Sequence, residues 1–584
     1  MLSLILHAHL PFVRHRENDF LAGNWLFEAV AECYIPLLQM LDALTVVSGQ
    51  WTVDSGSATN CSRPTAPSPL PTAHCPLLTA HCPPAPLTFT LTPTLCAMLG
   101  DELLQNRLAD RFAQMLALAE KEVVRNAAAP PLKKLAEFYR TRWQTAAAYF
   151  AECERDLLAR FRRHYQDGRI EIMTCAATHA ILPLLLDRRA VLRQLRAGVN
   201  SFREIFDRAP RGCWLPECAY SPEVGAGLRE AGIAYTVLAA HAFLYGAPRP
   251  RRGVYAPGLT PDGLWVFGRD PESSKQVWSA RDGYPGAAAY REFYRDLGWD
   301  GDADYLREFY LAERHDLGFK YHRVTGEVGL DRKELYDPTA AAAQAALHAR
   351  HFLAARQQQT ARLTETFGAE PLIVAPYDAE LFGHWWYEGP QFLTEILAWA
   401  ADYGVAPTNP AAVIDAGKII PQAFSPAVSS WGDGGYFFTW LNGDNDWLYP
   451  PLRAAQKILN DLEDDATVAA NIAPNIAILR QMQRELLLAQ ASDWAFILTT
   501  RTLPDYARRR LTEHLQNFQR LADNLKADKP EAEKSEMEKS ETAWRRELAQ
   551  QNNLFADSVL GGTKIKNSSY AQKKEKPRMN TKRT

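Results

Sequence analysis

Short apolar runs alternate with long amphipathic stretches along most of the chain. Apolar residues recur at three- and four-residue intervals in five stretches, and this spacing predicts helices at about 101–165, 188–207, 339–366, 391–403 and 451–523. Between the helices lie short runs rich in β-branched and apolar residues, namely SLIL, IEIMT, CWLP, AYTVLAA and LIVAPY. Helices that alternate with short buried strands indicate a parallel sheet, so the predicted fold class is α/β.

A polar residue follows each of these five predicted strands. The residues are His7 and His9, His179, Glu217, His241 and Asp378. An α/β barrel gathers its active site at the carboxyl ends of its strands. The repeated pattern therefore predicts a barrel-type enzyme with these side chains at one mouth of the barrel.

Two segments depart from this alternation. Residues 46–87 contain eight prolines between Pro64 and Pro86, together with two copies of the unit TAHCP. We interpret this stretch as an irregular insertion, because it shows neither periodicity nor a sharp polar pattern. Its His-Cys pairs match no familiar zinc spacing, which argues against a metal site. Residues 527–584 are charged and end in a basic run, which predicts a largely disordered tail.

The charge balance and the lengths of the apolar stretches restrict what the protein is expected to bind. Lysine and arginine number 65 against 68 acidic residues, and the net charge of -3 argues against a dedicated nucleic-acid binder. No apolar stretch approaches the roughly 18 residues of a membrane span, and the first residues lack a signal-peptide pattern. Nine scattered cysteines fit reduced thiols, so the expected location is the cytoplasm.

His7 and His9 flank a single alanine, so both imidazoles lie on the same side of an extended strand. Spacing alone leaves three interpretations open. The pair forms hydrogen bonds near a loop, belongs to a metal site, or binds sugar hydroxyls. A metal site needs further ligands, and His179, His241 and Asp378 are the candidates.

Two carboxylates stand close to tryptophans at separate strand ends. Glu217 lies in RGCWLPECAY, where Trp214 and Pro216 are apolar neighbours that perturb a carboxyl pKa on burial. Asp378 lies in APYDAELFGHWWYEGP, where polar residues interleave with five aromatic rings and predict a cleft wall. Such a pair serves glycoside cleavage, with one carboxylate as nucleophile or base and the other as acid.

The second aromatic run is SSWGDGGYFFTWLNGDNDWLYPP. Its seven rings surround glycines at 432, 434 and 435, and these glycines oppose a helix. The run therefore predicts a loop with exposed rings that stack on sugars. The 15 tryptophans of the chain, more than a core needs, agree with a sugar-binding cleft.

Seven ordered segments resemble glycoside hydrolase family 57, of the 1,4-α-glucan branching enzyme type. They are HAHLPFVRH, GRIEIMTCAATHAILPLL, GCWLPECAY, FGRDPESSKQVWS with GYPG, APYDAELFGHWWYEGP, SSWGDGGYFFTWLN and AQASDWAFILTT. The resemblance implies a (β/α)7 barrel, an inserted helical subdomain and an all-helical C-terminal domain. The expected bounds are 1–420 for the barrel, 98–165 for the subdomain and 421–526 for the C-terminal domain.

The same resemblance implies a retaining mechanism with Glu217 as nucleophile and Asp378 as general acid/base, and it implies no metal and no organic cofactor. It also implies a set of substrate-binding residues: His7, His9, Trp25, His179, Trp214, Arg269, Trp278, Gly286, Trp431, Trp440, Asp493, Trp494 and Thr502. Of these, the three histidines and Trp25 are expected to line the donor subsites. An acceptor-side loop is expected within 245–263, and the sequence leaves the role of Tyr255 open.

Two features depart from the family pattern. The insertion at 46–87 has no counterpart there, and Arg501 and Thr502 stand where the family has glycine and then a polar residue. The implied activity transfers part of an α-1,4-glucan to a 6-hydroxyl, which makes the α-1,6 branches of glycogen. The alternatives are an α-amylase-like hydrolase or a 4-α-glucanotransferase with the same site, a non-catalytic glucan-binding protein, and a metal-dependent hydrolase.

Overall fold

A ring of parallel strands forms the centre of the computed structural model, which describes residues 1–15, 22–47, 50–53, 85–279, 283–311, 313–465, 472–527 and 536–560. Within these ranges seven strands run parallel, in the order β10 (Ile373–Asp378), β1 (Leu2–Ala8), β4 (Leu87–Leu91), β5 (Ile170–Cys175), β6 (Gly212–Trp214), β7 (Tyr235–Leu238) and β9 (Trp265–Gly268). A bridge between Arg269 and Val374 joins the end of β9 to β10 and closes the ring. The predicted (β/α)7 barrel is confirmed.

The five strands predicted from short apolar runs are all present. Every residue of β1 and β4 is buried, because helices cover the barrel outside and side chains fill its interior. The apolar pattern singled out neither β4 nor β9. Two further short strands, β8 (Gly258–Leu259) and β11 (Gln422–Ala423), extend the sheet beyond β9.

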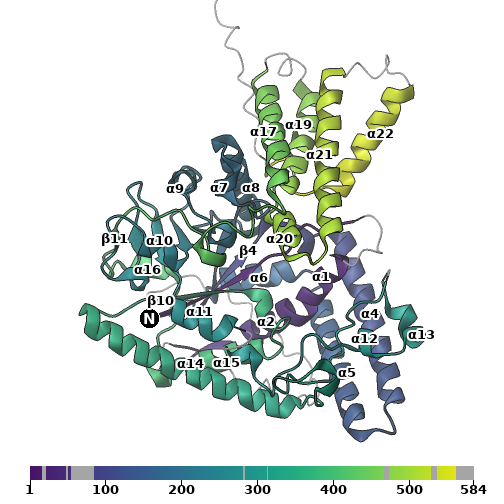
Figure 1. Cartoon of the computed structure of the whole chain (residues 1–584), viewed down its shortest axis with the longest axis vertical. Coiled ribbons are helices and arrows are strands. Elements are labelled where there is room, and N and C mark those ends of the chain that lie inside the picture. Colours follow the sequence, from purple (N-terminus) through teal and green to yellow (C-terminus); the bar gives the residue numbers. More distant parts are fainter. Residues whose placement is uncertain are drawn as a thin grey trace, which may run out of the picture.

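Helices surround the barrel on the outside (Figure 1). Those of the barrel are α1 (Ala22–Ala29), α2 (Ile35–Asp42), α3 (Pro93–Leu99), α7 (Leu182–Leu185), α8 (Arg188–Phe206), α9 (Pro222–Glu230), α10 (Ala240–Leu244), α11 (Pro271–Trp278), α14 (Pro338–Phe367), α15 (Gly389–Trp399) and α16 (Pro410–Ala416). Across the described ranges, we find no helix with both the length and the apolar character that a membrane crossing needs.

The predicted helical subdomain consists of three helices. They are α4 (Glu102–Arg125), α5 (Pro130–Glu152) and α6 (Leu157–Gln166). The later segment with α12 (Leu297–Asp300) and α13 (Ala303–Leu306) packs on them. Tyr139 of α5 donates a hydrogen bond to the Lys320 carbonyl at 2.6 Å, and the fully buried Glu122 of α4 accepts one from Tyr321 at 2.8 Å. The subdomain is therefore assembled from two distant parts of the sequence.

The predicted insertion at 46–87 begins in regular structure. Strand β2 (Leu44–Val47) pairs antiparallel with β3 (Gln50–Val53), so the first part of the stretch is a hairpin and the irregular interpretation is wrong there. Residues 54–84, including both TAHCP units, lie outside the described residues. The chain is described again from residue 85 and enters β4 at Leu87.

The C-terminal helices stand together at one end of the molecule (Figure 1). They are α17 (Tyr449–Asp464), α19 (Ile472–Ala489), α20 (Ser492–Thr500), α21 (Pro504–Ala527) and α22 (Glu536–Gln551). The expected boundary at 420 falls too early. Strand β11 still pairs with the barrel sheet, and bridges tie Ser425 to Ala247 and Ser429 to Tyr220.

The expected disordered tail is wrong for residues 536–560, which belong to the folded C-terminal domain. After α22, the Asn552 amide donates to both carboxylate oxygens of the fully buried Glu485, at 2.9 and 3.1 Å. Asn200 of α8 also donates to the Val559 carbonyl at 2.9 Å, which links this segment to the barrel. A charge-rich sequence predicts a solvated segment. The prediction fails here because the few apolar residues of the helix contact elements that are distant in the sequence. Residues 561–584 lie outside the described residues.

A chain that ends at residue 526 is expected to melt more than about 5 °C below the full chain. The deletion exposes Glu485 without its asparagine partner and removes the buried side chains of Leu548, Leu554, Phe555 and Val559. Each buried apolar side chain contributes about 1.5–3 kcal/mol to the free energy of unfolding. Calorimetry measures the difference. The control ends at Leu560 and should melt with the full chain, and equal melting of both truncations would contradict the assignment.

Candidate active site

The carboxyl ends of the strands bring the predicted site residues to one mouth of the barrel. Asp378 is the last residue of β10 and lies in register with His7 of β1. Trp214 ends β6, and Glu217 follows three residues later. Because all these strands run parallel, side chains just beyond their ends face a common space.

A tight turn presents Glu217. Glu217 lies within a 3-10 turn (Pro216–Cys218), and its φ of 57° is in the left-handed region. A non-glycine residue in this region costs about 1–2 kcal/mol, so its surroundings hold it there. Cys218 N–H donates to the Leu215 carbonyl at 2.8 Å, and Trp431 N–H donates to the Glu217 carbonyl at 2.9 Å.

Burial raises the pKa of Glu217 to about 7. The indole N–H of Trp431 donates to its Oε2, and this hydrogen bond opposes the shift because it stabilises the charged form. On the other side, Nδ1 of His179 lies 4.0 Å from Oε1. The carboxyl group of Glu217 is therefore bound by Trp431 on one oxygen and lies near His179 on the other.

The pKa of Asp378 is also raised. Burial raises its pKa well above the ordinary value, and the negative charges of Glu217 and Glu380 add to this, while Arg269 opposes it. An ionised Glu217 therefore favours the protonated form of Asp378. Glycoside cleavage uses such a pair, in which the ionised carboxylate acts as nucleophile and the protonated carboxyl group acts as acid.

The three histidines form a stacked cluster next to Glu217. The His9 and His179 rings are 3.8 Å apart, and Nε2 of His7 lies 2.9 Å from Nε2 of His179. Burial lowers the pKa of His7 and of His179 well below the ordinary value, so both rings are neutral. In the described part of the chain, no three His, Cys, Asp or Glu side chains are grouped to hold a metal ion. These contacts favour the hydrogen-bonding interpretations over the metal one.

The C-terminal domain holds this cluster in place. Ser492, the first residue of α20, has its Oγ 2.9 Å from His179 Nδ1. The next residue, Asp493, lies 3.2 Å from His9 Nε2. Sequence reasoning found Asp493 and missed Ser492, although the two are adjacent, because a serine at a helix start carries no chemical signal of its own.

A cleft beside Glu217 is lined by His241, Arg269, Trp278 and Trp431, among other residues. The Arg269 guanidinium lies 4.9 Å over the Trp431 ring, and Trp278 meets the same ring edge-on. Trp214 is fully buried beneath, stacked on His7 at 4.9 Å. Trp278 and Trp431 thus form part of the cleft wall, and Trp214 packs behind Trp431 with its ring 5.0 Å away.

Four other predicted residues lie apart from this wall. Trp494 is enclosed, and its indole N–H donates to the Leu488 carbonyl. Trp440 is enclosed too, against Gly432. Thr502 is exposed, with its hydroxyl 2.7 Å from that of Thr500, and Trp25 is half-buried edge-on to Tyr506. The two enclosed tryptophans support the site as packing.

The remaining predictions concern Gly286, Tyr255 and the aromatic run around Asp378. Gly286 ends a 3-10 turn (Tyr284–Gly286) that packs against α11. Tyr255 is anchored, since its hydroxyl donates to Asp270 at 3.2 Å, and it is not an exposed loop tip. The cleft-wall prediction is largely wrong, because Tyr377, Phe382 and Trp386 are buried core residues.

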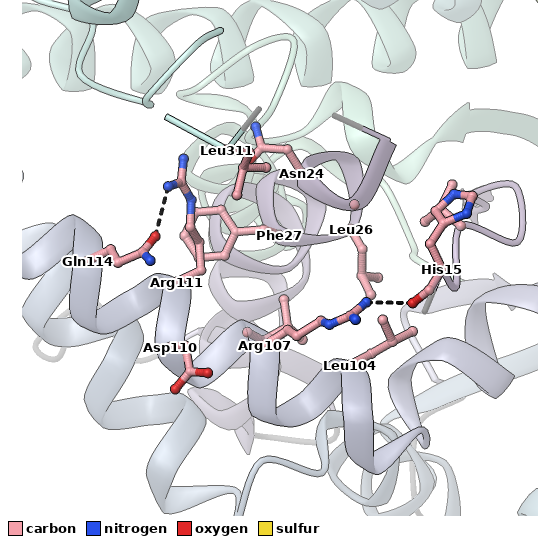
Figure 2. Close-up of a pocket in the computed structure, with 13 residues that line it drawn as sticks. His15, Asn24, Leu26, Phe27, Leu104, Arg107, Asp110, Arg111, Gln114 and Leu311 are labelled. Atoms are coloured by element: carbon pink, nitrogen blue, oxygen red, sulfur yellow. Dashed lines mark hydrogen bonds between the residues drawn. The ribbon is translucent and has the colours of Figure 1, made fainter. Parts of the chain in front are cut away.

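Figure 2 shows a second cavity, between α1 and α4. Arg107 donates to the His15 carbonyl there at 2.7 Å, and Arg111 donates to Gln114 at 3.0 Å. Asp110 is the single carboxylate among the described residues that line it. Glycoside cleavage needs two carboxyl groups, so the chemistry belongs to the mouth of the barrel.

A barrel whose mouth carries two carboxyl groups with raised pKa values, next to tryptophans, defines an enzyme that cleaves glycosidic bonds. Comparison with known proteins makes this more specific. Residues 3–398 match the profile of glycosyl hydrolase family 57, and residues 453–558 match that of the 1,4-alpha-glucan branching enzyme C-terminal region. The chain belongs to glycosyl hydrolase family 57.

Several relatives match over nearly the whole chain. A 1,4-alpha-glucan branching enzyme from Thermococcus kodakarensis is 28% identical over 590 residues, 96% of this chain and 78% of its own, and its crystal structure superposes with a TM-score of 0.80. The crystal structure of AmyC from Thermotoga maritima, described as a novel alpha-amylase, is 35% identical with a TM-score of 0.81, covering 96% of this chain and 98% of its own. A family 57 branching enzyme from Pyrococcus horikoshii is 28% identical with a TM-score of 0.77 and covers 96% of both chains.

The pH dependence of kcat/KM should follow the two carboxyl groups. Activity rises with pH through about 7, because Glu217 must lose its proton to attack, and falls at higher pH, where Asp378 loses its own. Trp431→Phe removes the hydrogen bond that stabilises the Glu217 carboxylate. The acid limb of the profile should therefore move to higher pH in this variant.

Trp278→Phe is the matched control for this measurement. It alters a ring in the same cleft but removes no hydrogen bond to Glu217. Its acid limb should stay at the wild-type pH even where its KM rises. An acid limb that moves equally in both variants, or in neither, would contradict the role given to Trp431.

Proposed function

We propose that this protein is a 1,4-α-glucan branching enzyme. It cleaves an α-1,4 bond within a linear glucan, holds the donor part on the protein, and transfers that part to a 6-hydroxyl of an acceptor chain. The product carries a new α-1,6 branch point, as glycogen does. α-1,4-Glucan is thus both donor and acceptor.

In the first step the Glu217 carboxylate attacks the anomeric carbon, and Asp378 gives its proton to the departing 4-oxygen. A covalent glycosyl ester and a free chain end result. In the second step the Asp378 carboxylate takes the proton of the acceptor 6-hydroxyl, whose oxygen displaces Glu217 from the anomeric carbon. Both carboxyl groups return to their starting states, which requires no cofactor.

The neutral histidines suit the donor sugar. A neutral imidazole donates and accepts hydrogen bonds with hydroxyl groups, whereas a cationic ring next to Glu217 would oppose the positive charge of an oxocarbenium-like transition state. Arg269 lies beside Asp378 and over the Trp431 ring, where its charge favours the ionised form of Asp378.

The observation that carries the proposal is the contact of α20 with the histidine cluster (His7, His9 and His179), which we propose to bind the donor sugar. This helix lies in the region that matches the C-terminal part of branching enzymes, and it provides Ser492 and Asp493 to His179 and His9. The region is therefore part of the site rather than an appendage. The six described cysteines carry free thiols, which supports the cytoplasm as the location.

Hydrolysis of the same α-1,4 bond is the second candidate. The observation in its favour is the identity of 35% with the Thermotoga protein that is described as an alpha-amylase. Water would then replace the acceptor hydroxyl in the second step. The choice depends on how well the cleft excludes water and holds an acceptor.

Linkage counting distinguishes the two functions. With amylose as substrate, a branching enzyme forms one α-1,6 linkage for each bond it cleaves and leaves the number of reducing ends nearly constant. We expect new α-1,6 linkages, measured after debranching, to exceed new reducing ends by at least about ten-fold, which corresponds to about 1.4 kcal/mol between the two acceptors. Mainly new reducing ends would make the protein a hydrolase.

Variants of the two carboxyl groups test the mechanism. Glu217→Gln should lower turnover of amylose by about 10⁴-fold or more, because no covalent intermediate forms. Asp378→Asn should lower it by about 10²–10⁴-fold. An aryl maltoside with a nitrophenolate leaving group needs no proton, so bond cleavage should be largely restored for Asp378→Asn and not for Glu217→Gln. If Asp378→Asn lost as much bond cleavage on the aryl maltoside as on amylose, the assigned roles would be contradicted.

A further inference from the structure

A third carboxyl group lies next to the catalytic pair. Glu380 follows Asp378 by two residues, within the 3-10 turn Ala379–Leu381, and its side chain is buried. Neither the nucleophile nor the acid of the proposed reaction is this residue. A buried carboxylate costs free energy unless other groups compensate it, so the contacts of Glu380 indicate what it does.

Two hydrogen bonds hold Glu380 in place. Its Oε1 accepts one from the Tyr34 hydroxyl at 2.5 Å and one from the backbone N–H of His9 at 3.2 Å. Burial raises the pKa of Glu380, and these two bonds oppose the rise because they stabilise the charged form. The structure thus provides for a carboxylate at this position.

A π-helical turn, Val30–Tyr34, provides the tyrosine. It lies between α1 and α2, and all five of its residues are buried. The same turn contacts the segment after β10 twice more: the Cys33 thiol donates to the Ala379 carbonyl at 3.0 Å, and a Cβ at Gly383 would lie 1.9 Å from the Glu32 carbonyl oxygen. Burial raises the pKa of the thiol and of the tyrosine, so neither is charged. Such π-helical turns are frequent at functional sites.

The bond from the His9 backbone connects Glu380 to the histidine cluster. The His9 ring stacks on His179, its Nδ1 lies 3.1 Å from Thr92 Oγ1, and its Nε2 lies 3.2 Å from Asp493. These contacts orient the ring, and the bond to Glu380 fixes the backbone that carries it. One carboxylate therefore holds the histidine cluster in a defined position relative to the catalytic acid.

The charge of Glu380 also acts on Asp378. Burial raises the pKa of Asp378 most, the negative charges of Glu217 and Glu380 raise it further, and the Arg269 guanidinium lowers it. Cys218 lies near the pair too, but burial raises the pKa of its thiol, which stays uncharged. The proton affinity of Asp378 therefore depends on two neighbouring carboxylates and one arginine.

Ester formation removes one of these two carboxylate charges. Once Glu217 is bonded to the anomeric carbon it is neutral, and it no longer raises the proton affinity of Asp378. Asp378, now a carboxylate, must accept the proton of the attacking hydroxyl. The hydroxyl oxygen meanwhile bonds to the anomeric carbon, and Glu217 leaves with the electron pair of the ester bond. Glu380 takes part in neither bond change and keeps its charge.

We propose that Glu380 is a positioning residue for the second step of the reaction. Its carboxylate fixes the His9 backbone beside the site, and its charge keeps Asp378 an effective base while Glu217 is esterified. The inference rests on the retaining mechanism of the proposed function. It does not depend on the choice between branching and hydrolysis, because both release the same ester.

Glu380→Gln tests the proposal in the full-length protein, because glutamine keeps the length and an acceptor oxygen but removes the charge. Turnover of amylose should fall about ten-fold, and the alkaline limb of kcat/KM should move about one unit to lower pH, since Asp378 then loses its proton more readily. With an aryl maltoside, kcat/KM reports ester formation, which needs no proton, and should change less than about three-fold. The kcat on this substrate should fall about ten-fold, with a burst of nitrophenolate as the ester accumulates.

Glu388→Gln is the matched control. Glu388, the residue before α15, is also a buried carboxyl group, and its Oε1 accepts a hydrogen bond from the Tyr336 hydroxyl at 2.7 Å and one from the Arg291 backbone N–H at 3.1 Å. It does not contribute to the pKa shift of Asp378. This variant should keep the alkaline limb of the wild type and show no larger burst.

Tyr34→Phe is a second variant that carries the test if Glu380→Gln folds poorly. Without the tyrosine hydroxyl, Glu380 holds its proton to higher pH, so the burst should appear at the acid end of the profile and disappear as pH rises. An unchanged burst in both variants, or an equal change in Glu388→Gln, would overturn the role of Glu380.

A purely structural role for Glu380 gives a different result. Glu380→Gln would then lose as much kcat/KM on the aryl maltoside as on amylose, and this outcome would also overturn the proposal. Failure of the proposed function is seen separately, in Glu217→Gln. If that variant still turned over amylose and gave the wild-type burst, the retaining mechanism would be wrong, and the role of Glu380 would be rejected with it.

Discussion

The double contact between Trp431 and Glu217 organises the site. The backbone N–H of Trp431 holds the left-handed turn that presents Glu217, and its indole N–H binds the carboxylate. Through these two hydrogen bonds, a loop more than 200 residues away in sequence stabilises the conformation and the charged form of Glu217. The Arg269 guanidinium lies over the ring of the same tryptophan, which also forms one wall of the cleft. Catalytic charge, substrate shape and loop position therefore depend on one side chain.

Much of the barrel could be predicted from the sequence, because each strand is a short apolar run followed by a polar residue. The pattern identified Glu217 and Asp378 for the same reason, as carboxylates at strand ends next to aromatic residues. Strands β4 and β9 were not among the five predicted runs, although both are short buried runs. The pairing of β9 with β10 through Arg269 and Val374 is a long-range contact that local patterns do not encode.

In the two aromatic runs, the sequence does not predict which rings are buried and which are exposed. Around Asp378, rings and carboxyl groups alternate as a cleft wall would, yet Tyr377, Phe382 and Trp386 are core. In the run after Ser430, neighbouring rings separate into buried and exposed sets. Glycines permit backbone turns that break any regular period, so the direction of each ring is decided by the surface against which the loop packs. The helix at 536–551 was missed for a related reason: its place in the fold depends on Glu485 and Arg484 of α19.

The contact between α20 and the histidine cluster also has a consequence for synthesis of the protein. Ser492 and Asp493 reach histidines that precede them by more than 300 residues. Domains fold from the N-terminus as the chain leaves the ribosome, at about 5–20 residues per second. The barrel thus emerges before Ser492 and Asp493 can reach His179 and His9. The histidine cluster is therefore complete only after the C-terminal helices have left the ribosome and docked on the barrel.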